Sequence, residues 1–403
     1  MIQRIEYLNW LKSWQGQQIV KVVSGVRRCG KSTLFDLFRQ YLRESGVSED
    51  RIVSLNFEDL DYEYLSDYRA LYDHVRDRLV EGQMTYVFLD EIQHVEHFEK
   101  AVDSLFIREN VDVYITGSNA YFMSGELATV LTGRYVELRM LPLSFSEFCQ
   151  AADSDLSRAQ LFNRYVTSGS FPYVSRFRLD DLDARTYLVD IYRSVLLKDV
   201  VARLGVSDVT TLENITRFLL QNVGSKVSLK KIGDTLKSAG TGVDQKTVSR
   251  YVRGLVDSLL LYEAPRYNVK GRQLLTTQPK YYAVDLGLRH ALVKGSASDV
   301  GHILENVIYL ELLRRGYQVY VGALPEGEVD FVAIRNGQTE YYQVSATVLQ
   351  EDTLRRELGA FDRIQDNYPK YLLTLDELFP EADYDGVQKL NALDWLLNSP
   401  AVG

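Results

Sequence analysis

The sequence has few of the residues that build disulfide frameworks or zinc clusters. Only two cysteines, Cys29 and Cys149, occur in 403 residues, so no disulfide framework is expected and a reducing, cytoplasmic location is the default. Its five histidines are scattered, which argues against a zinc cluster, and no Ser-His-Asp set is evident. These shortages point the search for chemistry toward other motifs.

Long apolar runs and a positive net charge are also missing. No stretch of 18 apolar residues occurs, so no membrane span is expected, and the N-terminus MIQRIEYLNWLKSW is too polar for a signal peptide. The net charge of -9 excludes a general polyanion binder but still allows a local basic face. The length and the 46% hydrophobic content predict a folded protein of two or three domains.

The first motif that is present is a glycine loop. Residues 25–32, GVRRCGKS, match G-x-x-x-x-G-K-[ST], follow the apolar run IVKVVS and precede a segment with apolar residues at helical spacing. Backbone N–H groups of such a loop cradle phosphates, Lys31 reaches the β- and γ-phosphates, and the Ser32 hydroxyl is a ligand of Mg²⁺. The predicted nucleotide-binding residues are Gly25, Val26, Arg27, Arg28, Cys29, Gly30, Lys31, Ser32 and Thr33.

Two acidic residues end the next buried strand, in TYVFLDEIQ. Asp90 is expected to hold Mg²⁺ and Glu91 to orient and polarise the attacking water. A pair of carboxylates at the end of a buried strand is costly to desolvate unless a cation compensates for it. The motif therefore predicts a catalytic carboxylate beside a metal-binding one.

Three further polar residues are weaker candidates for catalysis. Ser118 and Asn119 end the strand VDVYITG, and they either position the attacking water or simply cap a turn. Arg134 precedes another strand-like run, and it either stabilises charge on the γ-phosphate, from its own subunit or a neighbour, or is a surface arginine.

The pieces GVRRCGKST, FLDEIQ, TGSN, LTGRY and PLSFSEF occur in order, and with SGSFPYV and KYYAVDLGLRHALV they resemble a family of prokaryotic AAA-type ATPases. Members of that family carry a C-terminal domain of unknown function that resembles restriction-endonuclease folds. The resemblance implies ATP rather than GTP, and no guanine-reading N-K-x-D segment is obvious. It leaves open whether Arg27 and Arg28 pair with acids on a helical lid or meet the nucleotide of a neighbouring subunit.

The expected fold class is α/β, in three parts. Residues 1–150 are expected to form the AAA-type P-loop ATPase domain, residues 151–275 a helical lid with a winged helix-turn-helix, and residues 276–403 a nuclease-like α/β domain. The winged helix is predicted from two amphipathic helices, capped by Ser228 and Asp244, and a hairpin that turns near residues 268–271.

Basic residues gather in this middle segment. Residues 226–280 contain eleven basic and four acidic residues, a net charge of +7 within a chain of -9. Such asymmetry is typical of a face that contacts DNA, although winged helices also serve protein packing. The DNA-binding candidates are Lys246, Arg250, Arg253, Lys270 and Arg272.

The C-terminal segment predicts a nuclease-like core with an incomplete site. Glu305 and Asp330 fit two metal-binding positions that the resemblance implies, but the expected acid-x-lysine is replaced by Gln343-Val344-Ser345. An amide and a hydroxyl replace neither a ligand charge nor a lysine. We therefore expect no strand cleavage, unless Glu340 or Glu351 takes over the missing role.

The sequence thus predicts a cytoplasmic, Mg-dependent ATPase that acts on DNA as a nucleotide-driven switch or motor and forms a homo-oligomer that depends on nucleotide. One alternative is an ATP-gated nuclease. The other is an ATP-dependent signalling scaffold that has no role with nucleic acid.

Overall fold

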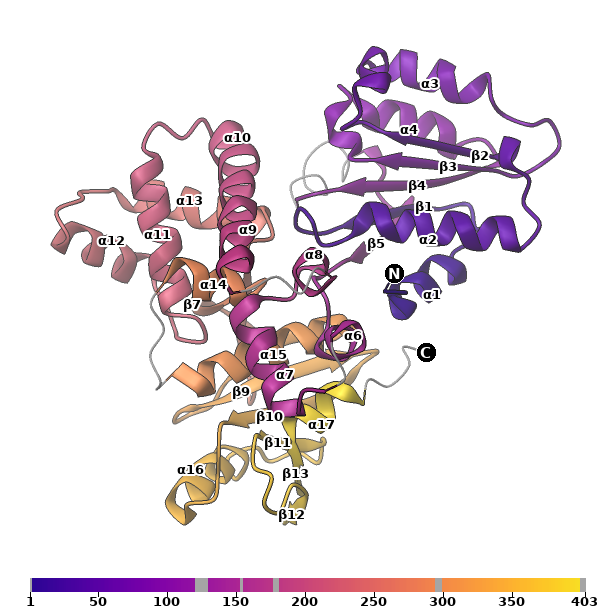
Figure 1. The fold of residues 1–403 in the computed structure, drawn as a ribbon. Helices are drawn as coiled ribbons and strands as arrows, with labels where there is room; N and C mark the ends of the chain where they lie inside the picture. The colour runs from indigo at the N-terminus through magenta and orange to yellow at the C-terminus, as the bar shows by residue number, and fades with distance from the viewer. Residues whose placement is uncertain (1, 120–129, 153–154, 177–180, 294–298, 399–403) are drawn as a thin grey trace. The chain divides into compact units, whose positions relative to one another are not determined.

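The computed structural model describes residues 2–119, 130–152, 155–176, 181–293 and 299–398 (Figure 1). The chain divides into two compact units. Unit 1 consists of Met1–Pro142 with Asp257–Leu259, and unit 2 consists of Leu143–Val256 with Leu260–Gly403. Within the described ranges, no helix is both long enough and apolar enough to cross a bilayer.

Unit 1 is built on a five-stranded parallel sheet of order β2-β3-β4-β1-β5. Its strands are β1 (Val20–Ser24), β2 (Ile52–Asn56), β3 (Thr85–Asp90), β4 (Val111–Gly117) and β5 (Tyr135–Arg139). Its longer helices are α1 (Ile5–Ser13), α2 (Lys31–Glu44), α3 (Tyr68–Arg76) and α4 (Phe98–Phe106), and short 3₁₀ turns span Glu49–Arg51, Leu60–Leu65 and Ile92–His94. Because all strands are parallel, their carboxyl ends meet at one edge of the sheet.

Both faces of this sheet are covered, which explains the continuous apolar runs of its central strands. Side chains alternate along β3, so Val87 and Leu89 join the core formed with α3 and α4. Phe88 points the other way and packs against Phe35 and Phe38 of α2, with ring centroids 5.2 and 6.1 Å apart. Because side chains alternate between the two faces of β3, one face packs against α3 and α4 and the other packs against α2.

Unit 2 begins with helices and continues as a mixed α/β structure. Its helices are α6 (Phe145–Ala151), α7 (Arg158–Ser168), α8 (Pro172–Arg176), α9 (Asp181–Ser194), the π-helical turn η5 (Val195–Val201), α10 (Ala202–Leu204), α11 (Val209–Gln221), α12 (Leu229–Ser238), α13 (Gln245–Asp257), α14 (Leu286–Leu292), α15 (Val300–Arg314), α16 (Glu351–Phe361) and α17 (Ala392–Leu397). Its strands are β6 (Leu261–Asn268), β7 (Gln273–Ala283), β8 (Gln318–Ala323), β9 (Glu328–Arg335), β10 (Gln338–Ser345), β11 (Lys370–Thr374), β12 (Ala382–Tyr384) and β13 (Val387–Asn391).

These strands form one eight-stranded sheet of order β12-β13-β11-β10-β9-β8-β6-β7. The expected order of helix, helix and hairpin is present as α12, α13 and β6–β7, and the Ser228 and Asp244 side chains cap the two helices as expected. The boundary expected at residue 275, however, falls inside β7. Because β6 pairs with β8 through Arg266–Asn268, the hairpin is the edge of the C-terminal sheet and belongs to no separate domain.

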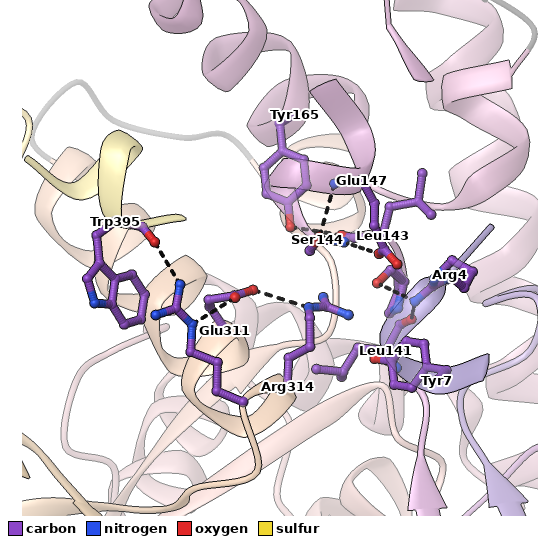
Figure 2. Close-up of polar contacts among 12 residues, drawn as sticks. Arg4, Tyr7, Leu141, Leu143, Ser144, Glu147, Tyr165, Glu311, Arg314 and Trp395 are labelled. Atoms are coloured by element: carbon purple, nitrogen blue, oxygen red, sulfur yellow. Dashed lines mark hydrogen bonds and ion pairs between the residues drawn. The ribbon is translucent and has the colours of Figure 1, made fainter. Parts of the chain in front are cut away.

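The described part of unit 2 also contains a buried ionic group that joins α15 to α17 (Figure 2). The Glu311 carboxylate accepts from Nε of Arg314 at 3.2 Å and from Nε of Arg315 at 3.0 Å. Arg315 also donates to the Trp395 carbonyl at 2.7 Å and lies over its ring. Pairing and hydrogen bonding compensate the burial of these charges, so we assign this group a structural role.

Candidate nucleotide site

The glycine loop lies between β1 and α2, at the carboxyl edge of the parallel sheet of unit 1. Gly25 packs so closely that a Cβ there would lie 2.5 Å from the Met140 carbonyl oxygen and 2.8 Å from Sγ of Cys29. Gly30 adopts a φ of 106°, a conformation that side chains disfavour. Both glycines of the motif are thus required by the shape of the loop.

Helix α2 begins directly at this loop, and Gly30, its N-cap, supplies no side-chain hydrogen bond to the first turn. The first turn of α2 contains no acidic residue. Free N–H groups and the partial positive charge of a helix N-terminus attract anions. The local backbone therefore fits a phosphate group, as the sequence predicted.

Lys31 connects this loop to the acidic pair that follows β3. Its Nζ lies 3.0 Å from the Gly25 carbonyl oxygen and 3.1 Å from Oε1 of Glu91, and its side chain is buried. Burial is the largest single influence and lowers the pKa of Lys31, but the charge and hydrogen bond of Glu91, together with Cys29 and Asp90, outweigh burial and raise it. Burial likewise favours a raised pKa for Glu91, but Lys31 and donors from Gln93 and Ser118 lower it to about 2. Both groups are therefore charged at neutral pH.

Asp90 lies beside the first turn of α2. Burial raises the pKa of Asp90, and hydrogen bonds from Ser32 and Thr116 partly oppose that rise. Oγ1 of Thr116 donates to Oδ1 of Asp90 at 2.5 Å. Oγ1 of Thr116 also accepts a hydrogen bond from the backbone N–H of Glu91 at 2.8 Å. A buried carboxylate next to an exposed serine hydroxyl is a donor set that fits Mg²⁺.

The polar end of β4 also belongs to this site. Ser118 is fully buried and Asn119 is nearly so, at the carboxyl end of the strand that pairs with β1. Oγ of Ser118 accepts from Gln93 at 3.3 Å, and Gln93 contacts Glu91. The structure therefore brings Ser118 to the acidic pair, where the sequence analysis left a turn cap as an alternative.

The two arginines of the loop have different environments. Nη1 of Arg27 lies 3.1 Å from Oε1 of Glu58, which follows β2 in the same unit. Arg28 adopts a φ of 68°, the left-handed conformation that is uncommon for residues other than glycine. The Arg27 pair thus links the loop to the neighbouring strand end, a partner that the sequence analysis did not identify.

Arg134 lies directly before β5, at the amino ends of the parallel strands, whereas the glycine loop lies at their carboxyl ends. Its carbonyl accepts from the Val20 N–H at the start of β1, whereas the glycine loop follows the end of β1. Its guanidinium pairs with Asp103 and lies over the Phe106 ring. Because β1 and β5 are parallel and five residues span roughly 16 Å, contact with the γ-phosphate of its own subunit does not fit this geometry. Two alternatives remain for this residue, which are contact with the nucleotide of a neighbouring subunit and a surface ion pair with Asp103.

The DNA-binding candidates are exposed in unit 2. Lys246, Arg250 and Arg253 lie along α13, and Lys270 and Arg272 lie at the turn between β6 and β7. On the opposite face of α13, Val248, Tyr251 and Leu255 are buried. The helix is therefore amphipathic in the direction that the sequence predicted.

The nuclease-like positions surround a buried lysine that the sequence analysis missed. Nζ of Lys280 lies 2.8 Å from Glu305, 3.1 Å from Glu328 and 3.8 Å from Asp330. Burial favours a lowered pKa for Lys280, but these three carboxylates raise it. Burial and the charge of Glu305 raise the pKa of Asp330 to about 7. The cluster already contains its own cation, so it does not fit a divalent metal ion as it stands.

The other residues considered for this site have structural roles. Gln343 accepts from the Asp330 N–H and donates to Glu357, which joins β9, β10 and α16. Glu340 accepts from the hydroxyls of Tyr317 and Tyr342, and its odd spacing from Gln343 puts it on the other face of β10. Glu351 is exposed and pairs with Arg355. These contacts do not support the alternative in which Glu340 or Glu351 takes over the missing role.

We expect Lys280→Met to destabilise unit 2 by about 3–5 kcal/mol, because it leaves buried carboxylates without their cation. The matched control is Lys226→Met. Nζ of Lys226 lies 2.7 Å from Oε2 of the same Glu328, but this ion pair is half-exposed. Its expected cost is about 0–1 kcal/mol. Urea unfolding followed by circular dichroism measures both, and equal losses in the two variants would show that the Lys280 cluster is not a buried ionic core.

Comparison with known proteins identifies the class of unit 1. Residues 17–149 match the model of an AAA domain, and residues 159–299 match a domain of unknown function, DUF8612. The N-terminal unit is therefore an AAA-type, P-loop ATPase-like domain. The second match covers the helical segment and the hairpin, whereas the sequence resemblance assigned the domain of unknown function to the C-terminal region. Neither description names a nuclease.

The chain is 38% identical over 401 residues to an uncharacterized protein of Haemophilus influenzae, with 98% of this chain and 99% of that protein covered. It belongs to the same family as that protein. An uncharacterized protein of Methanocaldococcus jannaschii is 27% identical, over 85% of this chain and 78% of that one. Among solved structures, a Walker-type ATPase of Pyrococcus abyssi matches with a TM-score of 0.47 and 14% identity, over 72% of this chain and 96% of that one.

Proposed function

We propose that this protein binds and hydrolyses ATP in unit 1 and couples hydrolysis to an action on DNA through unit 2. The observation that carries the first part is the convergence of Lys31, Ser32, Asp90 and Glu91 at one edge of the sheet. These residues come from the start of α2 and the end of β3, and their closeness supports the proposed roles.

In this proposal the chain acts by positioning and by neutralising charge. Loop N–H groups and Lys31 hold the phosphates, while Ser32 and Asp90 are the residues that would hold Mg²⁺. A bound Mg²⁺ would neutralise charge that develops on the β- and γ-phosphates. Glu91, a carboxylate at neutral pH, accepts a hydrogen bond from the attacking water and orients it. Water bonds to the γ-phosphorus, the bond to the bridging oxygen breaks, and the proton leaves with the phosphate products.

The experiment that tests the ATPase proposal measures phosphate release from ATP with Mg²⁺ present and with Mg²⁺ chelated. Turnover that stops on chelation supports the proposal. A protein that binds ATP but shows no turnover with Mg²⁺ would contradict the hydrolytic part of it. If Arg134 assists the γ-phosphate, it does so for a neighbouring copy in a homo-oligomer, because it lies at the amino end of its own sheet.

The proposal of DNA contact is supported by the exposed basic residues of α13 and the β6–β7 turn. They lie in a segment of net charge +7, although the whole chain carries -9. The Lys280 cluster supports a nuclease-like fold without strand cleavage, because the Lys280 ammonium lies between Glu305 and Asp330, the two residues that would hold a metal ion in a nuclease.

We expect Arg250→Ala with Arg253→Ala to weaken binding of duplex DNA and to reduce the slope of log K against log salt by about 2, since about 0.9 counterions are released per phosphate contact. The matched control replaces Arg355 and Arg356, two exposed arginines of α16, with alanine. Fluorescence anisotropy across a salt series measures both slopes. No salt-dependent binding of the duplex, together with no change in the α13 variant, would favour the signalling scaffold instead.

A further inference from the structure

A glutamine that follows the acidic pair makes two contacts that no role assigned so far explains. Gln93 lies in the 3₁₀ turn Ile92–His94 directly after β3. Its Nε2 donates to Oε2 of Glu91 at 2.5 Å and to Oγ of Ser118 at 3.3 Å. The amide nitrogen must face the carboxylate, because only that end of the side chain can donate. Gln93 thus joins the catalytic carboxylate of β3 to the polar end of β4.

The backbone at Glu91 shows why its side chain needs such support. Glu91 adopts a φ of 52°, a left-handed conformation that costs a residue with a side chain roughly 1–2 kcal/mol. The Thr116 hydroxyl accepts the Glu91 N–H at 2.8 Å and so holds the backbone. Among the described residues, the side chains that donate to the Glu91 carboxylate are Lys31, Gln93 and Ser118. The backbone and the carboxylate are therefore held by different residues.

These donors do not all remain when a nucleotide binds. Lys31 contacts Oε1 of Glu91 at 3.1 Å, whereas Gln93 contacts Oε2. In the proposed ATPase cycle, phosphate oxygens attract the Lys31 ammonium, which frees Oε1 of Glu91. Gln93, through Oε2, and Ser118 are then the side chains that still hold the Glu91 carboxylate. As a result, Oε1 is left free beside the position that Lys31 vacates.

The other end of the Gln93 amide indicates a role beyond stability. Among the described residues, Oε1 of Gln93 is buried and has no hydrogen-bond partner. A buried acceptor without a partner costs about 1–3 kcal/mol. A leucine or methionine would pack there without that cost. A polar group kept at this position despite the cost is better explained by its contact with Glu91.

We propose that Gln93 is a positioning residue for ATP hydrolysis, which fixes the Glu91 carboxylate so that its free oxygen meets the attacking water. This inference rests on the proposed ATPase function. It predicts that Gln93 affects the chemical step and leaves ATP affinity nearly unchanged, because Gln93 acts on the water-orienting carboxylate and has no place in the phosphate loop.

The test compares Gln93→Met, which keeps the length of the side chain and removes both donors, with the control His94→Ala at the exposed next residue. We expect kcat of Gln93→Met to fall about 10- to 100-fold, as for a misplaced catalytic group, with KM for ATP within about two-fold of the unaltered protein. His94→Ala keeps both values. Wild-type kcat in a folded Gln93→Met protein would overturn the inference.

Gln93→Glu provides a second readout that a structural role would not produce. The introduced carboxyl group donates to Glu91 while it is protonated, and it repels Glu91 once it ionises. We therefore expect its kcat, relative to the unaltered protein, to be highest at low pH and to decline as pH rises. A pH profile of Gln93→Glu parallel to that of the unaltered protein would contradict the inference. This result can be obtained even if Gln93→Met fails to fold. Absence of turnover in the unaltered protein would instead refute the ATPase proposal on which this inference rests.

Discussion

Lys31→Ala is expected to abolish measurable ATP turnover, with kcat reduced at least about 10²- to 10³-fold, as when a preorganised electrostatic group is removed. In the structure the Lys31 ammonium is buried between the glycine loop and Glu91, and its pKa is raised, so it is charged at neutral pH. Alanine removes the ammonium group that is proposed to contact the β- and γ-phosphates. ATP affinity should fall as well, because the same contact serves the bound substrate.

The control for this variant is Lys100→Ala, which removes an exposed lysine of α4 in the same unit. It should keep kcat and KM. Phosphate release at saturating ATP measures turnover, and circular dichroism establishes that both variants are folded. Turnover in Lys31→Ala within a few-fold of the control would mean that the glycine loop does not hold the reacting phosphates.

Glu91→Gln is expected to separate binding from hydrolysis. The amide is nearly isosteric with the carboxylate, so it should leave the loop and the ATP affinity nearly intact. It lacks the negative charge that orients and polarises the water. Only one of its two terminal atoms can accept a hydrogen bond, whereas the carboxylate accepts from Lys31 on one oxygen and from Gln93 on the other. We expect kcat to fall about 10²- to 10³-fold, with a dissociation constant for ATP within a few-fold.

Titration with a fluorescent ATP analogue and single-turnover kinetics measure the two quantities separately. The contrasting variant is Asp90→Asn, which should weaken the Mg-dependent part of binding because Asp90 lies against Ser32. Normal turnover in Glu91→Gln would reject Glu91 as the water-orienting group, even if Lys31→Ala is inactive.

Local patterns were enough to predict which residues lie together at the candidate nucleotide site. A strand, a glycine loop and a helix are contiguous, so Lys31 and Ser32 are placed by sequence alone. Asp90 and Glu91 end the next buried strand, and parallel strands bring such ends to one edge. Gln93 was overlooked because its contact with Glu91 depends on the left-handed backbone of Glu91, which the spacing of residues along the sequence does not predict. Arg134 could have been placed better, since a residue that precedes a parallel strand lies at the amino edge.

The C-terminal half depended on contacts that are distant in sequence. The hairpin β6–β7 was recognisable from its turn, but its pairing with β8 joins residues more than fifty positions apart, which no local period encodes. Lys280 reaches Glu305 and Asp330 only through that sheet. The sequence therefore showed that a nuclease lysine was missing after Asp330 but could not show that another lysine fills the space between the acids.

A crystal structure of the protein with Mg²⁺ and a non-hydrolysable ATP analogue tests the central claim most directly. The account predicts phosphate oxygens on the loop at 25–32, Nζ of Lys31 moved from Glu91 to those oxygens, and the metal ion on Ser32 and Asp90. An analogue bound elsewhere, or a Lys31–Glu91 pair still closed beside an occupied loop, would contradict it.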